Sequence, residues 1–164
     1  MPTGTKPVLC LDSNVFLAVI VPEVTKASRE DIRGSERALR ALETGEISAV
    51  TSVMALAEIR WVFAREDKPG FDVARATLEG GFHGHLTILP VDADLAVASA
   101  AHRRRYYSKA NSFSYNDGIF LATGIRTGAT ALLSTDPHLL RVAEIAAHRP
   151  ADFPAAIRAP RRSM

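Results

Sequence analysis

The chain has 164 residues, of which 47% are hydrophobic and 23% are charged, a size and composition that predict one globular domain with its own core. Its formal net charge of +2 permits a nucleic-acid partner without arguing for one, and its single cysteine, Cys10, excludes an intrachain disulfide. No apolar run approaches the roughly 18 residues that a membrane helix needs, so we expect no membrane segment and a cytoplasmic setting.

The first quarter of the chain predicts one strand and two helices. Residues 8–11 form an apolar run without alternation, which is typical of a strand buried on both faces of a parallel sheet. Residues 14–20 predict a short helix, and the polar residues 23–34 predict a loop or an irregular helix start. Apolar residues at helical spacing over 38–42 predict a second helix, which ends near Gly45.

The middle of the chain repeats this alternation of strand and helix. Residues 47–50 predict a strand, and residues 51–66 predict a helix whose first two residues, a threonine and a serine, are candidates for its N-cap. Residues 71–78 predict a helix that ends at paired glycines, and residues 86–89 predict a further strand.

The last part of the chain adds two helices, a strand and a final helix. The two helices are predicted over residues 92–107 and 117–126, and the strand over 130–133. The final helix is predicted within residues 134–146, with Pro137 at its first position, where proline is tolerated.

Strands that alternate with helices predict a parallel sheet with helices on both faces. The expected fold is therefore α/β, a three-layer α/β/α sandwich around a central parallel sheet. We expect a single domain over residues 1–157, followed by a short basic tail over residues 158–164 that frays from the domain.

Four carboxylates interrupt otherwise apolar sequence, at Asp12, Glu58, Asp117 and Asp136. The carboxyl ends of parallel strands meet at one edge of a sheet, so these groups are expected to cluster there, and a divalent cation would offset their mutual repulsion. Three of them also have a purely structural interpretation: Asp12 and Asp136 could cap helices, and Asp117 could stabilise the first turn of its helix. Glu58 does not, because it lies too far from the start of its helix.

Four segments resemble, in the same order, the acidic motifs of PIN-domain ribonucleases: LDSNVFL, TSVMALAEIRWV, SYNDGIFLATG and ALLSTDPHL. The compact size is most similar to the toxin nucleases of VapBC toxin–antitoxin pairs. The resemblance implies a PIN-like fold and a catalytic site that holds one or two Mg²⁺ or Mn²⁺ ions. The implied ligands and catalytic residues are Asp12, Glu58, Asp117 and Asp136, supported by Asn14 and by Ser134 or Thr135.

The favoured function is a metal-dependent endoribonuclease, the toxin of a type II toxin–antitoxin pair, with RNA as substrate and a small antitoxin as partner. Carboxylate oxygens select Mg²⁺ or Mn²⁺ and leave positions open for phosphate oxygens. The alternatives are a housekeeping RNA-processing nuclease, a PIN-like binding module without activity, and a phosphatase or response-regulator receiver with an acidic pocket. The phosphatase expects a second aspartate two residues after the first, where this chain has Asn14.

A basic segment, HRRRYYSKANS, is the candidate RNA-contacting surface. Its arginines and lysine would meet phosphates, and Tyr106 or Tyr107 would stack on a base. The basic residues concerned are Arg103, Arg104, Arg105 and Lys109. A solvated helix C-terminus is the alternative interpretation of the same residues, because cations are favourable there.

Two protein partners are expected from the same resemblance. A homodimer is expected, with apolar residues 38–42 and the predicted helix after Asp136 as candidate interfaces. An antitoxin helix is expected to cover apolar side chains near Met54, Trp61 and Phe63, unless these belong to the core.

Overall fold

Five parallel strands form the centre of the computed structural model, which describes residues 5–155. The strands are β1 (Val8–Leu11), β2 (Ser48–Ser52), β3 (Leu86–Leu89), β4 (Ala131–Leu133) and β5 (Ala146–His148). Their order across the sheet is β3-β2-β1-β4-β5, so β1 is central and pairs with both β2 and β4. The predicted tail 158–164 lies outside the described residues.

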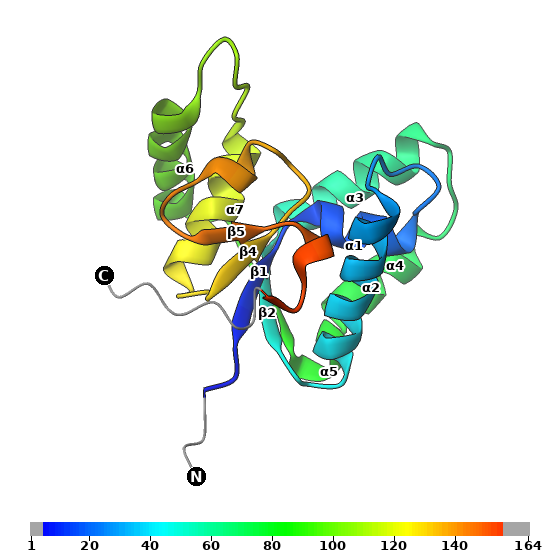
Figure 1. Cartoon of the computed structure of the whole chain (residues 1–164). Coiled ribbons are helices and arrows are strands. Elements are labelled where there is room, and N and C mark those ends of the chain that lie inside the picture. The colour runs from blue at the N-terminus through cyan, green and yellow to red at the C-terminus, as the bar shows by residue number, and fades with distance from the viewer. Residues whose placement is uncertain (1–4, 156–164) are drawn as a thin grey trace.

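Helices cover both faces of this sheet, which confirms the predicted three-layer sandwich (Figure 1). The helices of one layer are α1 (Ser13–Ile20), α2 (Arg29–Glu43), α3 (Met54–Arg65), α4 (Phe71–Glu79) and α5 (Gly81–Gly84). The helices of the other layer are α6 (Ala93–Tyr106) and α7 (Tyr115–Arg126). Within residues 5–155, no helix is long and apolar enough to cross a membrane.

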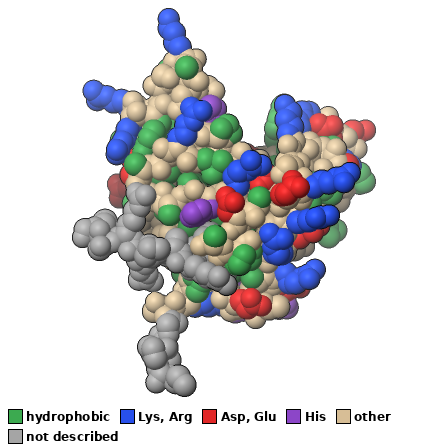
Figure 2. Space-filling view, in the orientation of Figure 1, with side chains coloured by type: hydrophobic (Ala, Val, Ile, Leu, Met, Phe, Trp, Pro, Cys, Tyr) green, Lys and Arg blue, Asp and Glu red, His purple; other side chains and the backbone are tan. Residues whose placement is uncertain are grey.

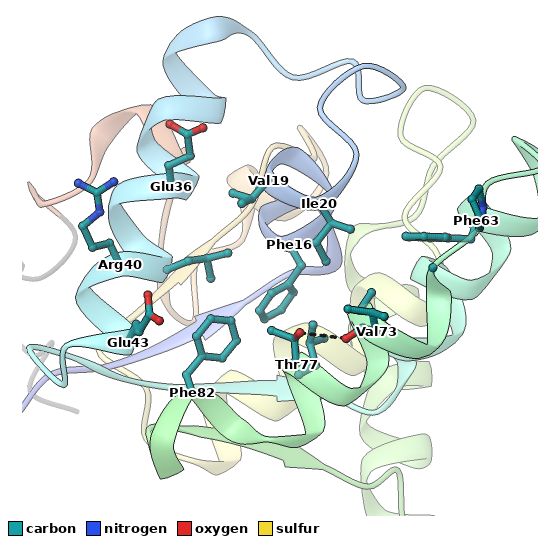
Figure 3. A pocket seen from close by; sticks show the side chains of 15 residues that line it. Phe16, Val19, Ile20, Glu36, Arg40, Glu43, Phe63, Val73, Thr77 and Phe82 are labelled. Carbon is teal, nitrogen blue, oxygen red and sulfur yellow. Dashed lines mark hydrogen bonds between the residues drawn. The ribbon is translucent and has the colours of Figure 1, made fainter.

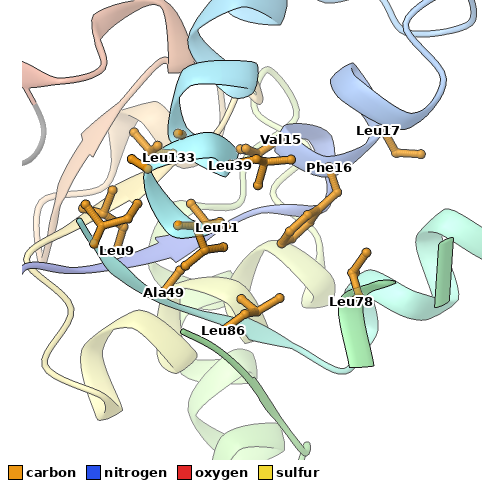
Figure 4. Packing of buried hydrophobic residues seen from close by; sticks show 14 of the residues in the cluster. Leu9, Leu11, Val15, Phe16, Leu17, Leu39, Ala49, Leu78, Leu86 and Leu133 are labelled. Atoms are coloured by element: carbon orange, nitrogen blue, oxygen red, sulfur yellow. The ribbon is translucent and has the colours of Figure 1, made fainter. Parts of the chain in front are cut away.

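The central strand β1 supplies side chains to two separate hydrophobic clusters. Leu9 and Leu11 point into the larger cluster, where they meet Phe16 of α1 and Leu39 of α2 (Figure 4). Cys10 points the other way, into the cluster beneath α7. Alternation of side chains along a strand places neighbours on opposite faces, so an unbroken apolar run serves both layers.

Two predicted boundaries in the first half of the chain are wrong. The segment 23–34 was expected to be a loop or an irregular helix start before a helix over 38–42. Instead α2 begins as a regular helix at Arg29, because the Ser28 side chain accepts a hydrogen bond from the Asp31 amide at 3.1 Å. The predicted cap residues Thr51 and Ser52 belong to β2 instead. The Thr51 hydroxyl donates to the Leu11 carbonyl at 2.7 Å and so joins β2 to β1.

The predicted final helix over 134–146 is also wrong. That segment holds only a 3-10 turn, η1 (Leu139–Arg141), and then β5 pairs in parallel with β4. The backbone groups along the outer edge of β4 find their partners in this strand, and Ile145 packs into the cluster beneath α7.

The turn η2 (Pro150–Asp152) docks on α2 at a helix position that has no side chain. A Cβ atom added to Gly34 would lie 1.8 Å from the carbonyl oxygen of Pro150. Nearby, the buried carboxylate of Asp31 pairs with Arg149 and accepts a hydrogen bond from the Ala151 amide at 3.1 Å. The contact therefore depends on close approach between two backbones and on one buried ion pair.

We predict that Gly34→Ala destabilises the protein by about 1–3 kcal/mol, because η2 must move to admit the methyl group. Alanine in an open helix position would instead stabilise it by up to about 1 kcal/mol. Urea denaturation measures the change. Arg33→Ala, on the exposed face of the same helix, is the control and should stay within about 0.5 kcal/mol. A more stable Gly34→Ala variant would show that η2 does not press on α2.

Candidate active site

Asp12 lies at the end of β1 and is the N-cap of α1, so the strand delivers its carboxylate to the carboxyl edge of the sheet. The side chain is 4% exposed. It accepts hydrogen bonds from the Ser13 amide at 2.7 Å, from Asn14 Nδ2 at 3.2 Å and from Ser134 Oγ at 2.6 Å. Burial, followed by the charge of Glu58, raises the pKa of Asp12 to about 7.

Glu58 reaches the same place from α3. Its Oε1 accepts a hydrogen bond from Asn116 Nδ2 at 3.1 Å, and its Oε2 accepts one from the Ser13 hydroxyl. Burial raises the pKa of Glu58 despite these two donors. The side chain thus joins α3 to both α1 and α7.

Asp117 is both a helix cap and a member of the acidic cluster. Its amide donates to Ser114 Oγ at 3.0 Å and its Oδ2 accepts from the Ser114 amide at 2.7 Å, which makes a capping box at the start of α7. Burial and the neighbouring charge of Asp136 raise the pKa of Asp117 to about 6. The capping interpretation is correct, and it does not exclude a second role.

Asp136 completes the cluster from the loop after β4. Its amide donates to Ser134 Oγ at 2.9 Å, and the same hydroxyl donates to Asp12, so Ser134 joins the two loops. The Oδ1 atom of Asp136 accepts a hydrogen bond from the His138 amide at 2.8 Å. Its charge helps to raise the pKa values of the other three carboxyl groups, so all four lie within electrostatic range.

The side chains that support the carboxylates are only partly those expected. Ser134 contacts Asp12, whereas Thr135 lies with Asn14 and Asp136 on the wall of a neighbouring pocket of about 540 Å³. Two supporting residues were missed, Ser13 and Asn116, although both directly adjoin a predicted aspartate in the sequence.

The donor set fits a hard divalent cation. Every charged group is a carboxylate, and the remaining groups are hydroxyls and amides, which Mg²⁺ and Mn²⁺ accept as oxygen ligands. Within residues 5–155, no three Asp, Glu, His or Cys side chains already converge as a metal-binding group. Burial, and after it the charge of neighbouring carboxylates, raises the pKa values of Asp12 and Asp117 in spite of their hydrogen bonds, and a bound cation would oppose both effects.

Some side chains of the predicted RNA-contacting segment make contacts within the protein, and others are exposed to solvent. Tyr106 packs against Phe113, with ring centroids 5.3 Å apart, and its hydroxyl donates to Glu144. Arg105 also pairs with Glu144, at 2.7 Å. Arg104 and Lys109 are exposed.

The face above the carboxyl edge of the sheet is hollowed. Figure 2 shows Lys and Arg side chains on both sides of this hollow, which separates the α6–α7 layer from the opposite layer of helices. Positive charge that flanks an acidic cluster is the arrangement expected for a polyanion that approaches bound cations.

Comparison with known proteins gives one family and three similar structures. The sequence profile of the PIN domain matches residues 9–145. VapBC2 from Rickettsia felis, bound to a promoter DNA fragment, shares 15% identity at a TM-score of 0.60 over 87% of this chain and 98% of that chain. FitAB bound to an IR36 DNA fragment shares 21% identity at a TM-score of 0.59 over 88% of this chain and 95% of that chain.

The third structure is FitAcB from Neisseria gonorrhoeae, with 20% identity and a TM-score of 0.58 over 89% of this chain and 99% of that chain. At such identities the likeness concerns the fold. No curated protein matches the sequence.

The raised pKa of Asp117 gives stability a defined pH dependence in the presence of a chelator. Between its ordinary value of 3.8 and its folded value of about 6, the folded protein holds more protons than the unfolded chain, so stability falls as the pH rises. We predict that Asp117→Asn lessens this fall and melts at a higher temperature than wild type at pH 7. Thermal melts from about pH 4 to 7 measure it.

Asp92→Asn is the matched control, because Asp92 caps α6 but lies outside the cluster. A hydrogen bond from Arg126 holds the pKa of Asp92 below its ordinary value, so its contribution is present at neutral pH and lost in acid. This variant should therefore lose stability at pH 7. If Asp117→Asn behaves in the same way, the carboxylate of Asp117 serves α7 as a cap and nothing more.

Proposed function

Because this chain belongs to the PIN-domain family, we propose that it is a nuclease that hydrolyses phosphodiester bonds in RNA with the help of Mg²⁺ or Mn²⁺. The observation that carries the proposal is the cluster of four carboxylates at the carboxyl edge of the sheet, of which one is buried and three are half-buried. Asp12, Glu58, Asp117 and Asp136 reach it from four different segments. Burial, with repulsion among the carboxylates added to it, raises the pKa values of the first three. Such a cluster is costly to a fold unless a cation occupies it in function.

Asp12 and Asp117 would hold the cation, with Glu58 and Asp136 as further ligands, directly or through water. When bound, a divalent ion supplies positive charge to phosphate oxygens and lowers the pKa of water. Ser134 and Asn14 orient Asp12 by donating to its Oδ2. Glu58, whose pKa is raised by burial and whose carboxylate is oriented by Ser13 and Asn116, is placed to accept a proton from the attacking water.

We predict that RNA cleavage requires Mg²⁺ or Mn²⁺ and that Asp117→Asn lowers its rate by more than about 100-fold, because a charged ligand is lost while the shape is kept. Single-turnover cleavage of a labelled RNA, with and without chelator, measures both effects. Asp94→Asn, an exposed carboxylate in the first turn of α6, should cleave as wild type does. Cleavage that persists in excess chelator contradicts the metal mechanism.

We further propose that the chain is a toxin restrained by a small antitoxin. Its fold is similar to those in VapBC2 and FitAB, and a groove between α1, α2 and α4 could receive a partner (Figure 3). The groove holds about 800 Å³. Its apolar lining comprises Phe16, Val19, Ile20, Leu39, Phe63, Pro69, Val73, Ala74, Leu78 and Phe82.

The groove differs from the expected landing site on α3. Phe63 does line it, but that side chain is only 4% exposed, and Met54 packs into the cluster beneath α7. Trp61 is 64% exposed and lies outside the groove lining. Glu36, Arg40 and Glu43 stand along the α2 rim with both signs of charge. An amphipathic helix with an apolar stripe and mixed charges would fit this surface.

We predict that Val73→Glu leaves the growth arrest caused by the chain intact but prevents an antitoxin encoded with it from relieving the arrest, because a charge then lies in the apolar groove. Val97→Glu is the matched control: both valines are 72% exposed, and Val97 lies on α6, away from the groove. If the antitoxin relieves the growth arrest of both variants to the same extent, docking in this groove is contradicted. If wild type causes no arrest, a housekeeping RNA-processing role is favoured.

The remaining alternatives differ from this chain in identifiable ways. A receiver has a flavodoxin-like sheet with its second strand at the edge, whereas here β2 lies between β1 and β3. A PIN-like module without activity would have no use for four clustered carboxylates. Cleavage of RNA also fits the cytoplasmic setting that we propose.

A homodimer stays a prediction, and its two expected interfaces are wrong. Residues 38–42 contribute their apolar side chains to the core, and η1 buries Leu139. Other apolar side chains are exposed and could form an interface. Within residues 5–155 the large ones are Val53, Trp61, Val73, Val97, Tyr107, Tyr115 and Ile125.

A further inference from the structure

Two exposed tyrosines and one arginine form a stack beside the acidic cluster. The guanidinium carbon of Arg103 lies 4.6 Å from the ring centroid of Tyr107 and 4.6 Å from that of Tyr115. Tyr107 is 50% exposed and Tyr115 is 56% exposed, so both rings present surface to solvent although the arginine contacts each of them. We name these three residues the Tyr–Arg–Tyr stack.

The stack rests on rigid supports. Tyr115 is the first residue of α7, and its carbonyl accepts a hydrogen bond from Ser99 Oγ of α6 at 2.5 Å. The two helices approach so closely there that a Cβ on Gly118 would lie 2.6 Å from the Ser99 carbonyl oxygen. The position of the stack is therefore set by helix packing.

The loop after Tyr107 is also connected by hydrogen bonds to the carboxyl edge of the sheet. Ser108 and Asn111 exchange backbone hydrogen bonds of 3.0 and 3.1 Å, and the Asn111 side-chain oxygen contacts His138 Nδ1. The His138 amide in turn donates to Asp136. This chain of contacts runs from the loop beside the stack to one of the four carboxylates.

The stack also lies next to the carboxylates along α7. Asn116, the residue after Tyr115, donates to Glu58, and Asp117 follows directly. Tyr115 is thus joined to the cluster through its covalent neighbour Asn116 and the hydrogen bond that Asn116 makes to Glu58. Tyr106, which was expected to stack on a base, instead packs inside the protein against Phe113.

We propose that the Tyr–Arg–Tyr stack binds unpaired bases of a single-stranded RNA whose backbone enters the acidic cluster. The inference rests on the proposed ribonuclease function and adds to it the residues that hold the bases. Every base offers a π-face, so stacking on tyrosine is tolerant of sequence, and Arg103 adds positive charge that a nucleic acid favours. Bases inside a duplex are already stacked, so the site selects unpaired RNA.

The test is the affinity for a fluorescein-labelled RNA oligonucleotide of mixed sequence, measured by anisotropy with the full chain carrying Asp117→Asn to prevent cleavage. In that background, Tyr115→Leu should weaken binding by about 5- to 150-fold, the equivalent of one lost base stack. Tyr115→Phe keeps the ring and should stay within about twofold. Affinity for a duplex of the same sequence should not respond to either change.

A second pair of variants separates stacking from charge. Arg103→Lys keeps the positive charge but loses the planar group between the rings, and should weaken binding to single strands. Arg75→Lys, at an exposed arginine of α4 outside the basic segment, should have no effect beyond about twofold. Tyr107→Leu repeats the test at the second ring, and thermal melts confirm that each variant is folded.

Three outcomes would overturn the proposal. Suppose that Tyr115→Leu and Tyr107→Leu bind single strands as tightly as their parent, while wild type cleaves RNA with metal. The stack then does not bind bases, although the ribonuclease function stands. If wild type neither binds nor cleaves RNA, the proposed function itself fails. If Tyr115→Leu changes the mass in light scattering, or the response to an antitoxin, without changing RNA affinity, the stack is a protein contact.

Discussion

A buried carboxylate without a cationic partner governs this structure. Asp12 ends the central strand and is enclosed by donors from the same turn and from the loop after β4. Its nearest charged neighbours are other carboxylates, so burial and repulsion act together to raise its pKa. The turn after β1 and the loop after β4 therefore both supply hydrogen-bond donors to this one group.

The hydroxyl groups show how the fold manages this charge. Ser134 donates to Asp12 and accepts from the Asp136 amide, and Ser13 donates to Glu58. Asp117 takes part in a capping box that stabilises α7 while it adds charge to the cluster. A single side chain thus stabilises one helix locally and destabilises the site electrostatically, which is common where function selects against maximal stability.

The two helical layers have separate tasks around the shared site. The layer of α1 to α5 carries the larger core and the apolar groove, whereas α6 and α7 carry the exposed tyrosines beside Asp117. The strand β1 is common to both, since its side chains alternate between the two cores. Under the proposed function, the protein partner and the RNA would therefore approach different surfaces of the molecule.

The sequence by itself determined the α/β class, the four strands β1 to β4 and the four carboxylates, because apolar runs and isolated charges are local signals. Tertiary structure decided what depends on distant partners. The strand β5 exists because β4 offers an open edge, and α2 begins at Arg29 because Ser28 caps it. Packing between α3, α6 and α7 likewise brings Asn116 to Glu58 and places Arg103 against two tyrosine rings. No spacing in the sequence encodes those contacts.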